Sequence, residues 1–226
     1  MDKTIKPIAY IKTDFKEKFG IPRQSGRVPS SLGEVVLLGK FNDENAIKRI
    51  EEFSHIWLIF GFSKNPETET LSVRPPRLGG NERVGVFASR SPFRPNSLGL
   101  SVVKLIEVKK DKQISLIVSG ADLLDGTPIY DIKPYLPSAD KIDNAIGGYA
   151  DEVKDYKLAV DISNELETLL PSEILSTVIK CLEDDPRPSY HEDGREYGMI
   201  YANYNIKFMV NGLTLRVTSV ETIENN

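Results

Sequence analysis

The sequence predicts a mainly β protein, an antiparallel or mixed β-barrel followed by a small α+β appendage at the C-terminus. Short segments rich in β-branched and aromatic residues recur through residues 1–150, and turn residues separate them. One helical segment interrupts these strands, whereas a doubly wound sheet needs helices that alternate with strands. No GxGxxG follows the first strand, which argues against a dinucleotide-binding fold.

The strand segments of the first part follow from their composition. Between the second and third strands, NDENAIKRIEEF predicts a short helix, because Asn42 or Asp43 can cap it and acidic residues in a first turn favour the helix dipole. The apolar runs predict strands over Ile5 to Ile11, Glu34 to Phe41, His55 to Phe62, Val84 to Ala88, Leu98 to Lys109 and Gln113 to Gly120.

The composition changes near residue 150, where Gly147-Gly148-Tyr149 suggests a boundary between residues 1–150 and 151–226. PSEILSTVIKCL predicts a helix from Pro171 to Leu182, with Cys181 on its apolar face. We therefore interpret Cys181 as a packed core thiol rather than a nucleophile. Met199 to Val210 and Leu213 to Val220 predict a closing hairpin through Asn211-Gly212.

Charge is divided unevenly between the two parts. Residues 151–226 carry seven Lys/Arg and fifteen Asp/Glu, a sum of about −8, so that residues 1–150 carry about +4 of the total of −4. A nucleic-acid partner therefore remains compatible with the acidic overall balance, because binding depends on the local patch. The start of the chain has no long apolar run and no span could cross a bilayer, which predicts no membrane partner and a cytoplasmic location.

The densest functional signal lies between Arg74 and Ser101. This segment holds five arginines, no lysine and a single acid, Glu82, with four prolines and four glycines among them. Guanidinium groups on a proline-stiffened loop suit the bidentate recognition of phosphates or carboxylates. A solvated surface loop is the alternative interpretation. The short apolar core Val84 to Ala88 favours a binding site.

Two further segments carry weaker signals. DLLDGTPIYDIKPY contains the turn signature Asp125-Gly126-Thr127-Pro128, which can expose backbone N–H groups together with a carboxylate. A plain turn is an equal alternative, and Asp122, Asp125 and Asp131 could instead complement a cation. FKEKFGIPRQ places Arg23 and Gln24 on a glycine/proline loop just after a strand.

The sequence lacks the motifs of several enzyme classes. With two histidines and one cysteine, the chain has neither a zinc cluster nor HExxH, so no metal site is expected. P-loop and GxSxG motifs are also missing. His55 begins an apolar strand, and we interpret it as a hydrogen-bonded structural histidine.

Taken in order, FKEKFGIPRQ, SHIWLIFGF, RPPRLGGNERVGVFASRSPFRPNSLGLS and DLLDGTPIYDIKPYLP resemble the TsaA-like family, and within it the TrmO-type tRNA (adenine-N6)-methyltransferases. DPRPSYHEDGREYG and YANYNIKFMV resemble the C-terminal part of the same proteins. The resemblance implies a β-barrel that binds S-adenosylmethionine without a Rossmann sheet. It also implies methyl transfer to N6 of threonylcarbamoyladenosine at position 37 of a threonine tRNA.

The resemblance further implies a cofactor site on four loops and a homodimer. Ser63 departs from the family, whose members carry histidine at this position, and a hydroxyl keeps a donor and an acceptor but no ring. The implied cofactor-binding residues are Pro22, Arg23, Gln24, Ser63, Lys64, Arg90, Leu100, Asp125, Gly126, Thr127 and Pro128.

The expected methyl transfer requires the adenine N6 to be made more nucleophilic. The N6 lone pair is delocalised into adenine, so a group that accepts the N6 proton would raise its reactivity. Asp131 and Tyr130 are candidates because they follow the cofactor turn, although an ion pair or a turn explains both equally well. Arg74, Arg77 and Arg94 are expected to contact phosphates of the anticodon stem-loop. A non-catalytic RNA-binding module and a small-molecule methyltransferase remain alternatives.

Overall fold

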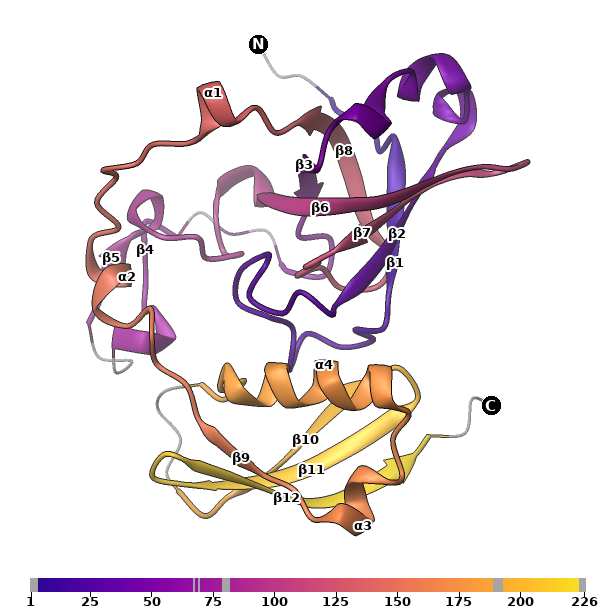
Figure 1. Cartoon of the computed structure of the whole chain (residues 1–226). Helices are drawn as coiled ribbons and strands as arrows, with labels where there is room; N and C mark the ends of the chain where they lie inside the picture. Colours follow the sequence, from indigo (N-terminus) through magenta and orange to yellow (C-terminus); the bar gives the residue numbers. More distant parts are fainter. Residues whose placement is uncertain (1–3, 67, 69, 79–81, 189–192, 224–226) are drawn as a thin grey trace.

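A computed structural model describes residues 4–223, apart from 67, 69, 79–81 and 189–192. Its first half is a closed barrel of six antiparallel strands in the order β1-β2-β7-β6-β3-β8. The barrel strands are β1 (Ala9–Thr13), β2 (Leu32–Leu37), β3 (His55–Gly61), β6 (Leu98–Lys110), β7 (Ile114–Ser119) and β8 (Thr127–Pro134). The predicted barrel class is therefore confirmed (Figure 1).

The barrel core follows from alternation along the strands. In β1 the side chains of Ala9, Ile11 and Thr13 are buried, while Tyr10 and Lys12 face outward. The same period of two sends alternate residues of the other strands inward, where they form one apolar cluster. Its fully buried members include Ile11, Val35, Ile56, Leu58, Leu116, Val118 and Ile129.

The second half is a four-stranded sheet covered by one helix. The sheet order is β10-β11-β12-β9, in which β9 alone runs parallel to its neighbour. In Figure 1 the helix α4 lies between this sheet and the barrel. The elements are α1 (Pro137–Asp140), α2 (Tyr149–Glu152), β9 (Ala159–Asp161), α3 (Asn164–Glu167), α4 (Ser172–Glu183), β10 (Glu196–Tyr201), β11 (Tyr204–Asn211) and β12 (Thr214–Thr222).

Several predictions for this half are confirmed. The helix at Pro171 to Leu182 is α4, and Cys181 is 2% exposed on its buried face. Burial, and then the charge of Asp184, raise the pKa of this thiol to about 12, which fits a core role. The hairpin through Asn211-Gly212 joins β11 to β12. The segment predicted as one strand from Met199 to Val210 is instead two, because a turn at Ala202 reverses the chain.

The structure corrects two other element predictions and adds one strand that was not predicted. The expected helix after Asn42 is a series of 3₁₀ turns, η1 (Gly39–Phe41), η2 (Glu44–Ile47) and η3 (Ile50–Glu52), because Arg49 takes a left-handed conformation that breaks a continuous helix. Asp43 does cap η2. The strand expected from Val84 to Ala88 is only β5 (Val84–Gly85), which pairs with β4 (Ser72–Val73) and leads into η5 (Val86–Ala88). Composition did not predict β8, whose sequence begins with a turn signature.

The β1–β2 loop packs into the hydrophobic core of the C-terminal half. Phe15 and Val28 are each 1% exposed and pack in the cluster formed by α4 and the C-terminal sheet. Gly20 has a φ of +88°, and a Cβ at this position would collide with the side chain of Met199. The loop that was expected to bind the cofactor is thus fastened to the C-terminal half.

Candidate active site

A cavity of about 700 Å³ lies where β3 ends and β6 begins, and the β1–β2 loop forms one of its walls. Its volume falls in the range of about 300–1,000 Å³ that is usual for small-molecule sites. Trp57 and Ile59 reach it from the face of β3 opposite the buried Ile56 and Leu58. The residues that line it are 18, 21–24, 57, 59–65, 89, 90, 92, 94, 98–101, 122–124 and 127.

This cavity unites segments that are far apart in the sequence. Of the residues expected to bind a cofactor, it is lined by Pro22, Arg23, Gln24, Ser63, Lys64, Arg90, Leu100 and Thr127. Two of them meet directly, since Arg90 Nη1 donates a 2.5 Å hydrogen bond to Gln24 Oε1. This bond connects the arginine-rich segment to the β1–β2 loop. Lys18 Nζ makes a similar connection by donating to the carbonyl of Lys64 at 2.6 Å.

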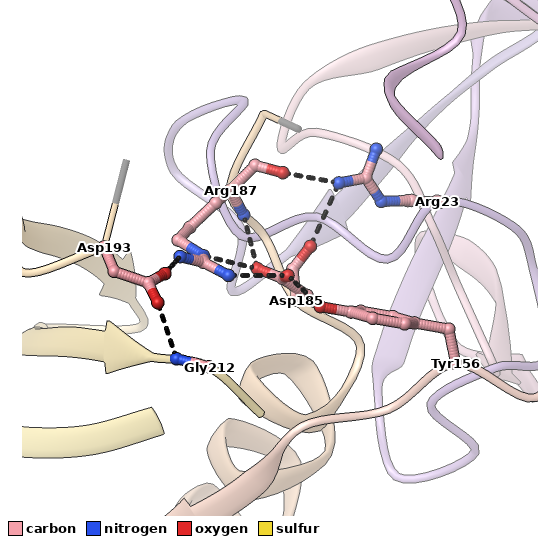
Figure 2. A network of polar contacts seen from close by, with 6 residues as sticks. All are labelled: Arg23, Tyr156, Asp185, Arg187, Asp193 and Gly212. Atoms are coloured by element: carbon pink, nitrogen blue, oxygen red, sulfur yellow. Dashed lines mark hydrogen bonds and ion pairs between the residues drawn. The ribbon is translucent and has the colours of Figure 1, made fainter. Parts of the chain in front are cut away.

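Arg23 is held by the C-terminal half of the chain (Figure 2). Its Nη2 donates to the backbone carbonyls of Asp185 and Arg187, at 3.0 and 2.7 Å. The Arg187 guanidinium in turn pairs with the Asp185 carboxylate at 3.0 Å, and both side chains are about one-tenth exposed. The Tyr156 hydroxyl donates to Asp185 Oδ2 at 3.1 Å, and burial followed by the Asp185 charge raises the pKa of Tyr156.

The same network continues to the end of the β11–β12 hairpin. Arg187 reaches Asp193 at 3.4 Å, and Asp193 accepts a 2.6 Å hydrogen bond from the Gly212 amide (Figure 2). A second connection joins the loop to the residue after α4, where Arg27 Nε donates to Asp184 Oδ1 at 2.6 Å. The conformation of the Arg23 loop therefore depends on the C-terminal half.

One carboxyl group lies in the wall of the cavity. Asp122 follows β7 and is partly buried, and its Oδ1 accepts a 2.7 Å hydrogen bond from the hydroxyl of Ser101, a residue that is 2% exposed on β6. Burial raises the pKa of Asp122 to about 6, although the Ser101 hydroxyl, a backbone hydrogen bond from Ser25 and the charge of Arg90 act in the opposite direction.

Other expected site residues lie away from the cavity. Asp125, Gly126 and Pro128 do not line it. The Asp125 carboxylate accepts from the Thr13 amide and pairs with Lys16, both at 3.0 Å, and so stabilises the turn before β8.

The two candidates for proton transfer also lie outside the cavity lining. Asp131 pairs with Lys133 at 3.2 Å and is about half exposed. Tyr130 sits where the β3–β8 register shifts, and its ring covers Gly61 closely enough that a Cβ there would approach it to 2.8 Å. His55, interpreted as structural, is indeed hydrogen-bonded, to Ser54 at 2.9 Å.

A second cavity of about 1,310 Å³ adjoins the first, and Arg23, Gln24, Ser89 and Arg90 line both. Arg74 and Arg83 contribute cationic groups to the second cavity, while Phe87, 80% exposed, and Phe93, 45% exposed, contribute aromatic faces. Arg94 lines the first cavity, where it donates to the Ser89 carbonyl at 2.9 Å. Arg77 belongs to η4 (Pro76–Leu78), and its side chain lies outside the described part of the chain.

Sequence reasoning missed the importance of Trp57, Phe62 and Ser101 for this site. A usable signal was present in HIWLIFGF, which is apolar on both faces. One face of a barrel strand fills the core, so a second apolar face needs a separate cover or ligand. For Ser101 no local signal exists, because its importance comes from its contact with Asp122 across the fold.

The fold is a closed six-stranded barrel braced by a second unit, without a Rossmann sheet, and its pocket between loops has a size typical of small-molecule sites. The chain belongs to the TrmO family: the model of the tRNA-methyltransferase O N-terminal domain matches residues 10–141, and that of the TrmO C-terminal domain matches residues 155–223.

Individual relatives agree with this membership. A tRNA (adenine(37)-N6)-methyltransferase of Escherichia coli K12 is 39% identical over 95% of this chain and 96% of its own length. A Pseudomonas aeruginosa protein, provisionally named an S-adenosylmethionine-dependent methyltransferase, is 42% identical over 88% of this chain and 89% of its own. A crystal structure of TrmO from P. aeruginosa superimposes with a TM-score of 0.80, at 35% identity and 98% coverage of both chains.

Two kinds of feature are absent from the described residues. No helix is long and apolar enough to cross a membrane. No group of three or more His, Cys, Asp or Glu side chains is arranged so that it could hold a metal ion.

Proposed function

We propose that this chain transfers a methyl group from S-adenosylmethionine to N6 of threonylcarbamoyladenosine at position 37 of a threonine tRNA. Its membership of the TrmO family and the names of its relatives make it an S-adenosylmethionine-dependent tRNA adenine-N6 methyltransferase. The threonylcarbamoyl group, the threonine tRNA, a homodimer and a cytoplasmic location go further and are our proposals. The observation that carries the assignment is the single cavity that collects residues from four distant segments.

The residues of this cavity fit the methyl donor. Phe60, Phe62 and Leu100 offer an apolar wall for an adenine ring, and cationic side chains can pair with a carboxylate. When bound, S-adenosylmethionine supplies a methyl group on an electrophilic sulfonium. We propose that the donor is held by the eight cavity residues Pro22, Arg23, Gln24, Ser63, Lys64, Arg90, Leu100 and Thr127. The turn residues Asp125, Gly126 and Pro128 would then act by shaping the rim.

The protein's own contribution is to orient the reactants. The Arg90–Gln24 hydrogen bond fixes two walls relative to each other, and the bond from Lys18 to the Lys64 carbonyl fixes a third. Such fixed geometry would supply several kcal/mol of the barrier reduction where it holds the reacting atoms about 3–3.5 Å apart.

We propose that the tRNA enters through the second cavity. Arginines 74 and 83 can contact phosphates there, and the exposed rings of Phe87 and Phe93 can stack on unpaired bases. An unpaired nucleotide of the anticodon loop can be extruded at less cost than a base in a duplex. The cavity shares residues with the first one, which allows the extruded base to reach the methyl donor.

The decisive experiment is methyl transfer from tritiated S-adenosylmethionine to tRNA that lacks this methylation, with and without its threonylcarbamoyl group. We expect label in threonine tRNA, and mass spectrometry of its nucleosides should find methylated threonylcarbamoyladenosine. Donor binding without transfer to any RNA would contradict the proposal and favour a non-catalytic module. Efficient methylation of a free nucleoside, independent of salt, would indicate a small-molecule enzyme.

A further inference from the structure

The reaction proposed above releases a proton from N6, and one carboxyl group in the cavity is placed to receive it. Asp122 is the single acidic side chain among the described residues that line the cavity. Asp125 and Asp131 lie outside this lining, and each of them already pairs with a lysine. The geometry therefore favours Asp122 over the residues that follow the turn.

The position of Asp122 is fixed by the barrel itself. Ser101 lies on β6 opposite Leu58 of β3, so the strand pairing sets where its hydroxyl points. That hydroxyl donates to Asp122 Oδ1 at 2.7 Å, which orients the carboxyl group before any ligand binds. Preorganisation of this kind is a general requirement for a catalytic group.

We propose that Asp122 accepts the N6 proton during methyl transfer and that Ser101 is its positioning residue; this rests on the proposed function. As the N6–C bond forms, the bond between the methyl carbon and sulfur breaks and its electron pair stays on sulfur. The N6–H bond gives its proton to the Asp122 carboxylate and leaves its electron pair on nitrogen. The products are a neutral thioether, methylated N6 and a protonated Asp122, which returns its proton to water.

The electrostatic surroundings suit this role. A carboxyl group with a pKa of about 6 is a stronger base than an ordinary aspartate, yet it is mostly ionised above pH 7. Among the cationic groups that line the same cavity, Arg90 lowers the pKa of Asp122 and so favours the carboxylate. The other cations of the lining are Lys18 and Arg23 from the β1–β2 loop, Lys64 after β3, and Arg94 from the arginine-rich segment.

The test measures single-turnover methylation of threonylcarbamoylated tRNA by Asp122→Asn, at saturating S-adenosylmethionine and across pH 5–9. We expect a loss of about 10²-fold or more at pH 7.5, the scale of a removed general base. The wild-type rate should rise with pH and level off above about 7, whereas the variant should lose this rise. Ser101→Ala should move the wild-type midpoint to higher pH, because the lost hydrogen bond lowers the pKa of Asp122.

Two aspartate variants serve as comparisons. Asp111→Asn removes a carboxylate on the exposed β6–β7 turn, and its pH profile should match that of the wild type. Asp131→Asn tests the rival base. If Asp131→Asn flattens the profile and Asp122→Asn does not, the assignment to Asp122 is overturned.

Two readouts do not depend on turnover. Carbon-13 NMR of the aspartate carboxyls in the protein alone should place the Asp122 midpoint near 6 and lose that resonance in Asp122→Asn. Calorimetry should give donor and tRNA affinities within about threefold of wild type, since a proton acceptor acts mainly in the transition state. A variant that binds no donor would overturn the proposal and make Asp122 a cofactor ligand. If the wild-type protein methylates no tRNA, the proposed function is wrong. If the wild type is active and Asp122→Asn methylates tRNA at the same rate, only the inference about Asp122 is wrong.

Discussion

At the scale of single residues, burial gives Asp122 and Cys181 opposite roles. Both lose hydration, and the loss raises both pKa values, to about 6 and about 12. For the carboxyl group this produces a moderate base that is still ionised near neutral pH. For the thiol it removes the reactive thiolate, which leaves Cys181 as a packing residue of α4.

The raised pKa of Asp122 has a consequence for stability. An acid whose pKa is higher in the folded state than in the unfolded state loses stability as pH rises from about 3.8 to about 6. The difference between these two pKa values corresponds to at most about 3 kcal/mol at neutral pH. We expect Asp122→Asn to unfold at higher urea than wild type at pH 7.5, with the difference shrinking below pH 4.

Urea unfolding at the two pH values checks this expectation. Asp111→Asn is the matched control, and its free energy of unfolding should follow that of wild type at both. A lower stability of Asp122→Asn at pH 7.5 would mean that the fold stabilises the charged carboxylate.

At the scale of elements, the β1–β2 loop is the connection between the two halves. It contributes Pro22, Arg23 and Gln24 to the cavity, while Phe15 and Val28 of the same loop pack into the C-terminal core. The Ala202 amide donates to the Asp14 carbonyl at 2.8 Å, and the Ile200 amide donates to Glu17 at 2.9 Å. The C-terminal half thus holds a wall of the pocket in place.

We expect Asp185→Ala to weaken S-adenosylmethionine binding about tenfold, because Arg187 loses its carboxylate partner and the carbonyls that hold Arg23 become free to move. Losing one partner of a buried pair should also lower the free energy of unfolding by about 3–5 kcal/mol. Calorimetry at a temperature where the variant is folded separates the two effects.

Asp161→Ala is the control for this variant. Asp161 pairs with Arg216 in the same C-terminal sheet, but both side chains are about half exposed or more. Exposed pairs contribute about 0–1 kcal/mol, so donor affinity and stability should hardly change. If Asp185→Ala lowers stability and leaves donor affinity intact, the network only stabilises the fold.

At the scale of the whole molecule, the positive and negative excess charges lie in different parts of the chain. The basic excess lies in residues 1–150 and the acidic excess in residues 151–226, and the described cations of both cavities come mainly from the first part. We propose this division, with its boundary inside α2, as the domain organisation of the chain. The acidic half contributes structure to the cavity through the network around Arg23.

This arrangement predicts a salt-dependent affinity for tRNA. The logarithm of the association constant should fall linearly with the logarithm of the salt concentration, by about 0.7–0.9 per phosphate contacted. Arg74→Ala should reduce this slope by about that amount and weaken binding to all tRNAs, with donor affinity unchanged. Filter binding over a salt series checks the slope.

Lys12→Ala removes one positive charge at a site that lines neither cavity, and its slope should match wild type. A slope that is unchanged in Arg74→Ala would place the tRNA elsewhere on the surface.

Local sequence determined much of this protein. Alternating and continuous apolar runs predicted the presence of β1, β2, β3, β6 and β7, because a strand with one buried face needs that period wherever it lies. The bounds of the first two strands were displaced: the predicted Ile5 to Ile11 is Ala9–Thr13, and the predicted Glu34 to Phe41 is Leu32–Leu37. The apolar face of α4 specified its burial, including that of Cys181. The motifs between Arg74 and Ser101 pointed to the family and to one part of the cavity's lining, residues 89, 90, 92, 94 and 98–101.

The remaining features were decided by tertiary structure, since they depend on partners distant in sequence. Burial in the folded chain raises the pKa of Asp122 to about 6, and the hydroxyl of Ser101 on β6 orients its carboxyl group. Arg23 acquires its orientation from carbonyls more than 160 residues further along the chain. Asp131 was an equally plausible base by sequence, and only the tertiary structure leaves it outside the pocket lining, where it pairs with Lys133 of the same strand. Local patterns encode which face of an element is buried, whereas the chemistry of a site depends on which elements the fold brings together.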